Sequence, residues 1–260
     1  MFYQYIKIEF FNQQVLPECW NAPYSTATFH KYAEPVPKVG EVPSPTESPS
    51  IYMLTEAAKK RNVWIVGGSV PERDGDKLYN TCVVVNNNGA IVGKHRKVHL
   101  FDIDVPGKIT FKESDALSPG NEPTTVETPW GIIGVGICYD LRFPEYAILL
   151  RQRGARLLVY PGAFNMVTGP AHWELLQRGR AVDNQLFVLT CSPARDTSPT
   201  PGYVAWGHSS VISPWGEVLA TTEAEEAVVF AELQLGKVEE MREGIPCWKQ
   251  KRDDIYKLQS

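Results

Sequence analysis

Short apolar runs rich in Val, Ile and Leu recur along this chain and set the main limit on its fold. Each run has the length of a β-strand and is bounded by turn residues. Helical patterns separate some of the runs, whereas hairpin turns join others, which predicts a mixed fold of the α/β or α+β class. We expect strands at residues 63–67, 81–85, 90–97, 124–128, 132–138, 157–160, 186–192, 209–213, 217–220 and 227–233, hairpin turns at 86–89 and 214–216, and helices at 51–61, 143–153, 171–184 and 235–243.

The charge balance disfavours several classes of function. The 260 residues carry 26 Lys and Arg against 30 Asp and Glu, a formal net charge of -4, with no basic block for a nucleic-acid backbone. No apolar run approaches the roughly 18 residues of a membrane span. Residues 1–11 are aromatic but contain Lys7 and Glu9 and lack the basic start of a signal peptide. We therefore expect no nucleic-acid or membrane partner and a cytoplasmic location.

The five cysteines are Cys19, Cys82, Cys138, Cys191 and Cys247. Their number is odd, they are widely spaced, and no Cys-x-x-Cys pair or zinc-type His spacing accompanies them. This pattern disfavours a disulfide framework and a zinc site. It leaves five buried thiols, or four buried thiols and one that does chemistry.

Residues 34–50 contain five of the chain's 20 prolines. Because proline can continue neither a helix nor a central strand, this segment is predicted to be a stiff surface connector. It ends at Ser48-Pro49-Ser50, where Ser48 is a plausible cap for the helix at 51–61. The sequence leaves open whether the connector covers a pocket as a lid.

Cys138 ends the apolar run Gly131-Ile-Ile-Gly-Val-Gly-Ile, and a helical pattern begins a few residues later. Such a strand-to-helix turn resembles the nucleophile elbow of serine hydrolases, with Gly134 and Gly136 letting neighbouring backbone approach. A helix N-terminus there would lower the thiol pKa and offer N–H groups to an oxyanion. The other interpretation is a buried structural thiol, because free cysteines are common in protein cores.

Two further segments carry candidate catalytic groups, each with a plain alternative. Lys97 lies in the basic segment Lys94-His-Arg-Lys-Val-His99, which can also be an exposed edge strand. Glu18 lies in Val15-Leu-Pro-Glu-Cys-Trp20, where desolvation would raise its pKa toward the range of a general base, although such a residue is usually a surface loop residue.

Together these segments resemble the nitrilase superfamily of carbon–nitrogen hydrolases. Leu-Pro-Glu18, Arg-Lys97-Val-His and Gly-Ile-Cys138-Tyr-Asp-Leu-Arg-Phe-Pro-Glu occur in the order of that family. The longer wording is similar to its ω-amidase branch, in Pro-Glu-Cys-Trp-Asn-Ala-Pro-Tyr24, the run from His99 through Glu113, Tyr160-Pro-Gly-Ala-Phe-Asn165, Gly-Pro-Ala-His172-Trp and Ser192-Pro-Ala-Arg195-Asp. The resemblance runs from about Val15 to the C-terminus.

The resemblance implies a four-layer α-β-β-α sandwich of the α+β class and a Glu18, Lys97, Cys138 triad. Cys138 would attack an amide carbonyl, and Glu18 would move the proton from the thiol to the leaving ammonia and then activate water. Lys97 and the backbone N–H of Tyr139 would hold the oxyanion. Glu113 would be a supporting residue that orients Lys97 or the substrate. The resemblance implies neither a cofactor nor a metal.

The substrate pocket is less defined. The resemblance places Tyr24 and Tyr139 beside the triad as pocket walls, and Arg195 is a weaker candidate for binding a substrate carboxylate. Arg142 is expected to pair with Glu145 across one helical turn.

Two other residues near these motifs are expected to have no catalytic role. His172 should have a core or capping role. Cys19, next to Glu18, should not be catalytic because it lacks a strand-to-helix elbow.

The function implied is an ω-amidase-like release of ammonia from the terminal amide of α-keto acid amides such as α-ketoglutaramate and α-ketosuccinamate. Other nitrilase-type amidases and carbamoylases share the triad and remain alternatives, and the family usually forms homodimers. The expected location is the cytoplasm, with the mitochondrion as a second one.

The N-terminus departs from the family pattern. Family members place a strand and a helix before Leu-Pro-Glu, and residues 1–14 have room for one strand at 5–11, so a strand–helix unit is expected to be missing. Residues 15–260 are expected to form a single hydrolase domain. An inactive, truncated subunit that serves only in binding or dimerisation is therefore a second hypothesis. Strand pairing at 5–11 and contact between Glu18 and Cys138 would distinguish the two.

Overall fold

The computed structural model describes residues 4–8, 13–200 and 202–256. Within these ranges, seven strands form a first sheet in the order β15-β1-β2-β3-β5-β4, with β6 also paired to β5. The strands are β1 (Gln4–Ile8), β2 (Gln13–Val15), β3 (Trp64–Val66), β4 (Val70–Asp74), β5 (Lys77–Val85), β6 (Ile91–Arg96) and β15 (Ala227–Ala231).

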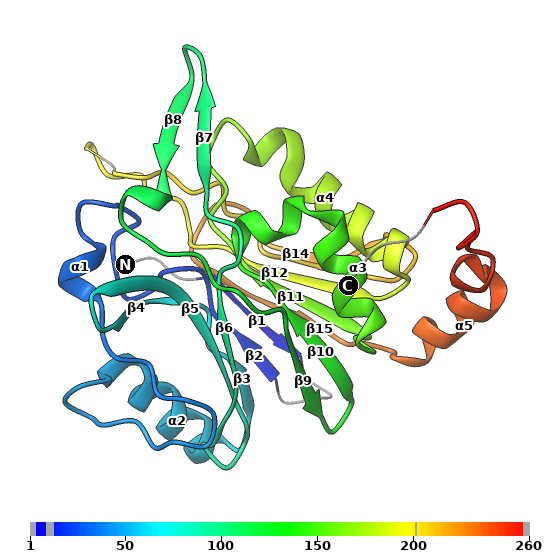
Figure 1. The fold of residues 1–260 in the computed structure, drawn as a ribbon, viewed down its shortest axis with the longest axis horizontal. Helices are drawn as coiled ribbons and strands as arrows, with labels where there is room; N and C mark the ends of the chain where they lie inside the picture. Colours follow the sequence, from blue (N-terminus) through cyan, green and yellow to red (C-terminus); the bar gives the residue numbers. More distant parts are fainter. Residues whose placement is uncertain (1–3, 9–12, 201, 257–260) are drawn as a thin grey trace.

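The second sheet has six strands in these described ranges, in the order β14-β13-β12-β11-β10-β9. They are β9 (Thr124–Thr128), β10 (Gly131–Val135), β11 (Leu157–Pro161), β12 (Phe187–Cys191), β13 (Ser210–Ile212) and β14 (Val218–Thr221). A separate hairpin, β7 (Asp102–Val105) with β8 (Ile109–Lys112), projects beyond the body of the molecule (Figure 1).

The two sheets pack face to face with helices outside them (Figure 1). One buried cluster joins Val15, Val66 and Val84 of the first sheet to Val135 and Val159 of the second, as in a sandwich core. Helix α2 (Pro49–Arg61) covers the first sheet, and α3 (Pro144–Gln152) and α4 (Gly169–Asn184) cover the second. The expected four-layer α-β-β-α sandwich is confirmed. The remaining helices are α1 (Phe29–Tyr32), α5 (Gly236–Gly244) and the 3₁₀ turns η1 (Glu113–Asp115), η2 (Cys138–Arg142) and η3 (Cys247–Lys249).

The N-terminal strand takes part in the first sheet. Strand β1 pairs in parallel with β15 and antiparallel with β2. The strand expected at 5–11 therefore exists over residues 5–8, and residues 9–11 lie outside the described part of the chain.

Most predicted elements are present within a few residues of their expected bounds, including the hairpin turns before β6 and β14. Strand β4 was missed because Val-Pro-Glu-Arg-Asp has charged residues and a proline, which an edge strand tolerates. The β7–β8 hairpin was missed because its residues alternate between apolar and polar only over four positions per strand.

The expected Ser48 cap is wrong. The Ser48 hydroxyl donates to the Pro35 carbonyl, whereas the Glu34 carboxylate accepts the N–H groups of Ser50 and Ile51 at the start of α2. A carboxylate at this end of the helix is favoured by the helix dipole.

The proline-rich connector lies along the first sheet and away from the nucleophile. Gly40 donates to the Ile91 carbonyl, and the Lys94 ammonium donates to the Val36 carbonyl. Within the described chain, residues 35–48 do not line the cavity beside Glu18, so the connector is not a lid over it.

Candidate active site

Cys138 lies on a strained turn directly after β10. Its φ is +45°, a left-handed conformation that is uncommon for a non-glycine residue and concentrates at functional sites. A Cβ added at Gly136 would lie 2.5 Å from the Tyr160 ring, so only glycine fits there. The expected elbow is present, although it is the side chain of Tyr160 rather than backbone that approaches this glycine.

The buried Asp140 carboxylate stabilises the turn at Cys138 through hydrogen bonds. Its carboxylate accepts the N–H of Ile137 at 2.8 Å and of His99 at 2.9 Å, and it contacts the rings of His99 and His95 at 2.7 Å and 3.2 Å. Burial alone would raise the pKa of Asp140, but these hydrogen bonds outweigh it and hold the pKa well below its ordinary value.

Four predicted residues from distant parts of the chain meet at the elbow. Glu18 follows β2, Lys97 follows β6, Glu113 begins η1, and Cys138 begins η2. All four are buried. The Lys97 ammonium lies 2.9 Å from Oε1 of Glu18 and 2.8 Å from Oε2 of Glu113, so one buried cation bridges two carboxylates.

Glu18 is held through both carboxylate oxygens. Oε1 accepts from the Asn80 amide at 2.8 Å as well as from Lys97, and Oε2 accepts the Ala163 N–H at 2.9 Å. The neighbouring Cys138 thiol favours the ionised form of Glu18 and lowers its pKa, against the larger effect of burial. Glu18 and Cys138 are therefore neighbours in the same buried site.

Burial and charge set the protonation of the site. Burial raises the pKa of Glu18 against the attraction of Lys97. Burial would lower the pKa of Lys97, but Glu113 and Glu18 raise it well above its usual range. Burial and the neighbouring Glu18 raise the pKa of Cys138, so the expected lowering by a helix N-terminus is wrong. The resting thiol is neutral and needs a base to become a nucleophile.

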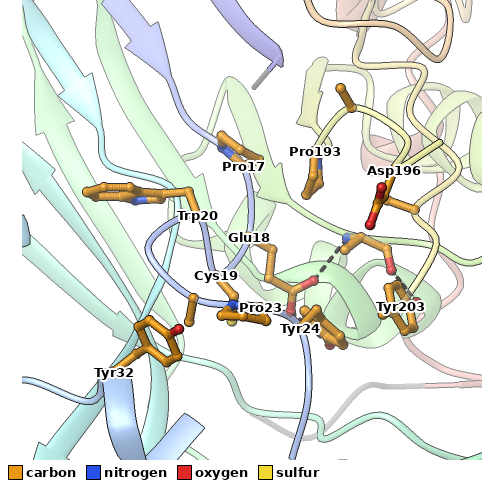
Figure 2. Close-up of a pocket in the computed structure, with 14 residues that line it drawn as sticks. Pro17, Glu18, Cys19, Trp20, Pro23, Tyr24, Tyr32, Pro193, Asp196 and Tyr203 are labelled. Atoms are coloured by element: carbon orange, nitrogen blue, oxygen red, sulfur yellow. Dashed lines mark hydrogen bonds between the residues drawn. The ribbon is translucent and has the colours of Figure 1, made fainter. Parts of the chain in front are cut away.

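A cavity of about 390 Å³ opens beside Glu18. Glu18, Tyr24 and Tyr203 lie near one another in this cavity (Figure 2). Oε2 of Glu18 accepts the Ala163 N–H, and the Tyr203 hydroxyl donates to the Ala163 carbonyl. The Tyr24 and Tyr203 rings lie 4.6 Å apart, and Phe111 from β8 packs on both. Tyr24 therefore lines this cavity.

Arg142, expected to pair with Glu145, lies instead beside the rings of Tyr139 and Phe164. It forms no ion pair with Glu145 within the described residues; its guanidinium lies 3.2 Å from Nδ1 of His172 and over the Phe164 ring. Burial lowers its pKa, against the opposing influence of Cys138. His172 itself is exposed, so a core role for it is wrong.

The other pocket candidates differ in position. Half-buried Tyr139 follows the nucleophile, and its ring packs against Phe101 and Phe143. The Arg195 guanidinium donates to the Trp206 carbonyl and lies over the Trp206 ring, so it is engaged in holding that loop.

Sequence reasoning missed Asn80, Ala163, Tyr203 and the role of Arg142. Ala163 acts through its backbone N–H, which no side-chain pattern reveals. Asn80 lies between Tyr79 and Thr81 in β5, and no local pattern marks it as a partner of Glu18.

Four of the cysteines are buried and Cys247 is exposed. The described residues contain no group of three or more His, Cys, Asp or Glu placed to hold a metal ion. In this part of the chain no helix is long and apolar enough to cross a membrane.

Comparisons with known proteins agree with this geometry. The profile of the carbon–nitrogen hydrolase family matches residues 14–243. The chain is 57% identical to omega-amidase NIT2 of Danio rerio over 246 residues, which cover 95% of this chain and 84% of the fish protein. It is 56% identical to the chloroplastic omega-amidase of Arabidopsis thaliana, covering 94% of this chain and 64% of the plant protein.

A solved structure is similar over nearly the same length. The crystal structure of Saccharomyces cerevisiae Nit3, a member of branch 10 of the nitrilase superfamily, superposes with a TM-score of 0.80. The two chains are 46% identical, over 92% of this chain and 82% of the yeast chain.

Proposed function

The chain belongs to the carbon–nitrogen hydrolase family and is an ω-amidase-type enzyme, and we propose that Cys138, Glu18 and Lys97 release ammonia from the terminal amide of an α-keto acid amide. The observation that carries the proposal is the Lys97 ammonium held between Glu18 and Glu113, with the Cys138 thiol beside the same Glu18. This set supplies a nucleophile, a base and a cation in one buried site.

In the first step, Sγ of Cys138 attacks the amide carbonyl carbon while Glu18 takes the thiol proton. The raised pKa of the thiol makes this base necessary, and the raised pKa of Glu18 makes it a better proton acceptor than an ordinary carboxylate. The C–N bond then breaks, Glu18 gives its proton to the leaving nitrogen, and ammonia departs. A thioester with Cys138 remains.

The negative oxygen of each tetrahedral intermediate lies between Lys97 and the backbone N–H of Tyr139. Lys97 is fixed for this task by Glu113, whose Oε2 also accepts the N–H of Phe101 at 2.7 Å. A fixed donor in a dry site stabilises an oxyanion by about 3–4 kcal/mol in other hydrolases. Glu113 therefore acts through Lys97.

In the second step, water attacks the thioester carbonyl and Glu18 takes its proton. The C–S bond breaks, the proton returns to the Cys138 sulfur, and a carboxylic acid leaves. The reaction consumes one amide and one water and yields ammonia and the acid, so the thiol and Glu18 return to their starting states.

Arg142 is the residue that best suits the substrate's carboxylate. It is a half-buried cation whose charge is felt by Cys138, and the aromatic rings of Tyr139 and Phe164 hold its guanidinium plane. A guanidinium binds a carboxylate through two parallel hydrogen bonds. This favours an amide that carries an acid at its other end over a neutral amide or a nitrile. Tyr24 and Tyr203 then form the wall around the chain between the two ends.

In the described residues β1 pairs in the sheet, and Glu18 lies close enough to Cys138 for the thiol to affect its pKa. This favours an active enzyme over an inactive subunit.

We also propose that residues 15–260 act as one domain and that the chain forms a homodimer. Support for the dimer is the apolar surface of α4 and the neighbouring β13–β14 turn, where Leu175, Val182 and Trp215 are exposed. Because the mechanism needs a reduced thiol, we place the protein in the cytoplasm, with the mitochondrion as a second location.

The test is ammonia release from α-ketoglutaramate by the purified chain beside its Cys138→Ala variant. Release by the chain alone, with a faster rate than for a neutral amide of similar length, supports the proposal. Equal rates for both amides would move the substrate class to uncharged amides. No release of ammonia by a folded chain from either amide would contradict the amidase mechanism.

A further inference from the structure

We propose that Asn80 is a positioning residue that decides which oxygen of Glu18 exchanges protons with Cys138. The inference rests on the proposed role of Glu18 as the base. Asn80 lies in β5, is fully buried, and donates its Nδ2 to Oε1 of Glu18 at 2.8 Å.

The donors around Glu18 are distributed unequally over its two oxygens. Oε1 accepts from Asn80 at 2.8 Å and Lys97 at 2.9 Å, which fills the two lone pairs of a carboxylate oxygen, and the Tyr24 hydroxyl lies at a longer 3.4 Å from the same oxygen. Oε2 accepts from the Ala163 N–H at 2.9 Å and keeps one lone pair. The preceding residue, Gly162, packs against the nucleophile, since a Cβ added there would lie 3.2 Å from Cα of Cys138, and this places the Ala163 N–H and Oε2 on the thiol's side. Oε2 is therefore the oxygen free to take the thiol proton.

The orientation of the Asn80 amide is fixed by its surroundings. Nδ2 faces Oε1 of Glu18 and lies 3.4 Å from Oε1 of Glu113. A flipped amide would turn Oδ1 toward these two carboxylates and repel both. In the observed orientation Oδ1 is buried with no hydrogen-bond partner among the described residues. A buried unpaired oxygen is unfavourable, and its presence indicates that the donor at Nδ2 is needed.

Asn80 also positions the cation. Its backbone carbonyl accepts the Lys97 N–H at 2.8 Å, where β5 and β6 lie side by side. One residue thus holds the backbone of Lys97 and the carboxylate of Glu18, which meet 2.9 Å apart.

Loss of the Asn80 donor changes the titration of Glu18 in a known direction. A donor to a carboxylate favours its ionised form, so removing it raises the pKa of Glu18. The base must be ionised, and the acid limb of kcat/KM therefore moves to higher pH. The other charged or titratable groups that face Glu18 stay in place: Lys97 after β6, Glu113 of η1, Cys138 of η2, and Cys19, Tyr24 and Tyr203 of the loops.

The experiment compares the pH dependence of kcat/KM for the full chain, Asn80→Leu and Asn80→Asp. Asn184→Leu is the matched control, because Asn184 is also a fully buried amide whose Nδ2 donates a hydrogen bond and whose Oδ1 has no partner among the described residues, but it lies at the end of α4. We expect Asn80→Leu to shift the acid limb upward by about one to two pH units, the effect of one charge-assisted hydrogen bond. Asn80→Asp adds a third carboxylate and shifts the limb in the same direction. Asn184→Leu leaves the limb unmoved.

A limb that stays in place in both Asn80 variants, whatever the loss of rate, would overturn the proposal and leave Asn80 a structural residue. Alkylation of Cys138 by iodoacetamide across pH, followed by mass spectrometry, gives a second measurement without turnover. The Asn80 variants should alkylate with the same upward shift. If the unsubstituted chain alkylates with an acid limb but releases no ammonia, the substrate assignment fails while the link from Asn80 to Glu18 is still tested.

Discussion

Nζ of Lys97 lies 2.9 Å from Oε1 of Glu18, and neither side chain touches solvent. Glu113 adds a second carboxylate to the same ammonium at 2.8 Å. Removing ionised groups from water costs several kcal/mol for each ion unless each finds close partners. Each of the three charges therefore needs the other two to offset the cost of its burial. The same contacts hold the three side chains in their catalytic positions.

Lys97→Met should remove both activity and stability. The variant leaves two buried carboxylates without their cation, which should lower the free energy of unfolding by about 3–5 kcal/mol. Ammonia release should fall by at least about 10²–10³-fold because the oxyanion loses a donor. Chemical denaturation and an ammonia assay measure the two effects. Lys94→Met is the control: it loses an ion pair with Glu72 at 2.7 Å but lies outside the site, so its rate should stay within about threefold.

Asp140→Asn should destabilise the elbow in a manner that depends on pH. Hydrogen bonds from His95, His99 and Ile137 hold the pKa of Asp140 below its ordinary value against the effect of burial. A carboxyl whose pKa is lower in the folded state stabilises the protein above the unfolded pKa of about 4 and loses this effect as the pH falls. We expect a loss of about 3 kcal/mol at pH 7 that shrinks below about pH 4. Urea unfolding at several pH values tests this, and a loss that is constant down to pH 3 would contradict it.

Arg142→Met should separate acidic from neutral substrates. Losing one charge-assisted contact should raise KM for α-ketoglutaramate by about 10–100-fold and leave KM for a neutral amide unchanged. Arg142→Lys should lie between the two, since an ammonium binds a carboxylate without the bidentate geometry. Steady-state kinetics on both substrates measure the split. Arg61→Met, at the exposed end of α2, is the control, and an equal rise of KM for both amides would exclude Arg142 as the carboxylate partner.

The structure agrees with the predictions that rest on neighbouring residues in the sequence. The apolar run before Cys138 and the helix after it predict the elbow, and the segments around Glu18 and Lys97 have family wording that places them beside it. The roles of Asn80 and Arg142 were not predicted because they come from contacts between residues far apart in the sequence. Asn80 contacts Glu18, 62 residues away, and Arg142 contacts His172, 30 residues away. Glu145 lies three residues after Arg142, a spacing that in a helix predicts an ion pair. The observed contact is with the more distant His172.

Cys19 and Cys138 provide the last prediction, because the two thiols share a left-handed backbone but differ in their surroundings. Both have positive φ, at +48° and +45°. Cys19 packs in the cluster with Phe29 and Leu117, and its N–H donates to the Ser69 hydroxyl, so its backbone is held for structural reasons. Cys138 has Glu18 beside it, and each group affects the pKa of the other. Cys138→Ala should abolish turnover, whereas Cys19→Ala should keep at least about a tenth of the rate. Intact-mass measurement during turnover should find the acyl adduct on the unsubstituted chain and on Cys19→Ala. If Cys19→Ala lacked the adduct, Cys19 and not Cys138 would be the nucleophile.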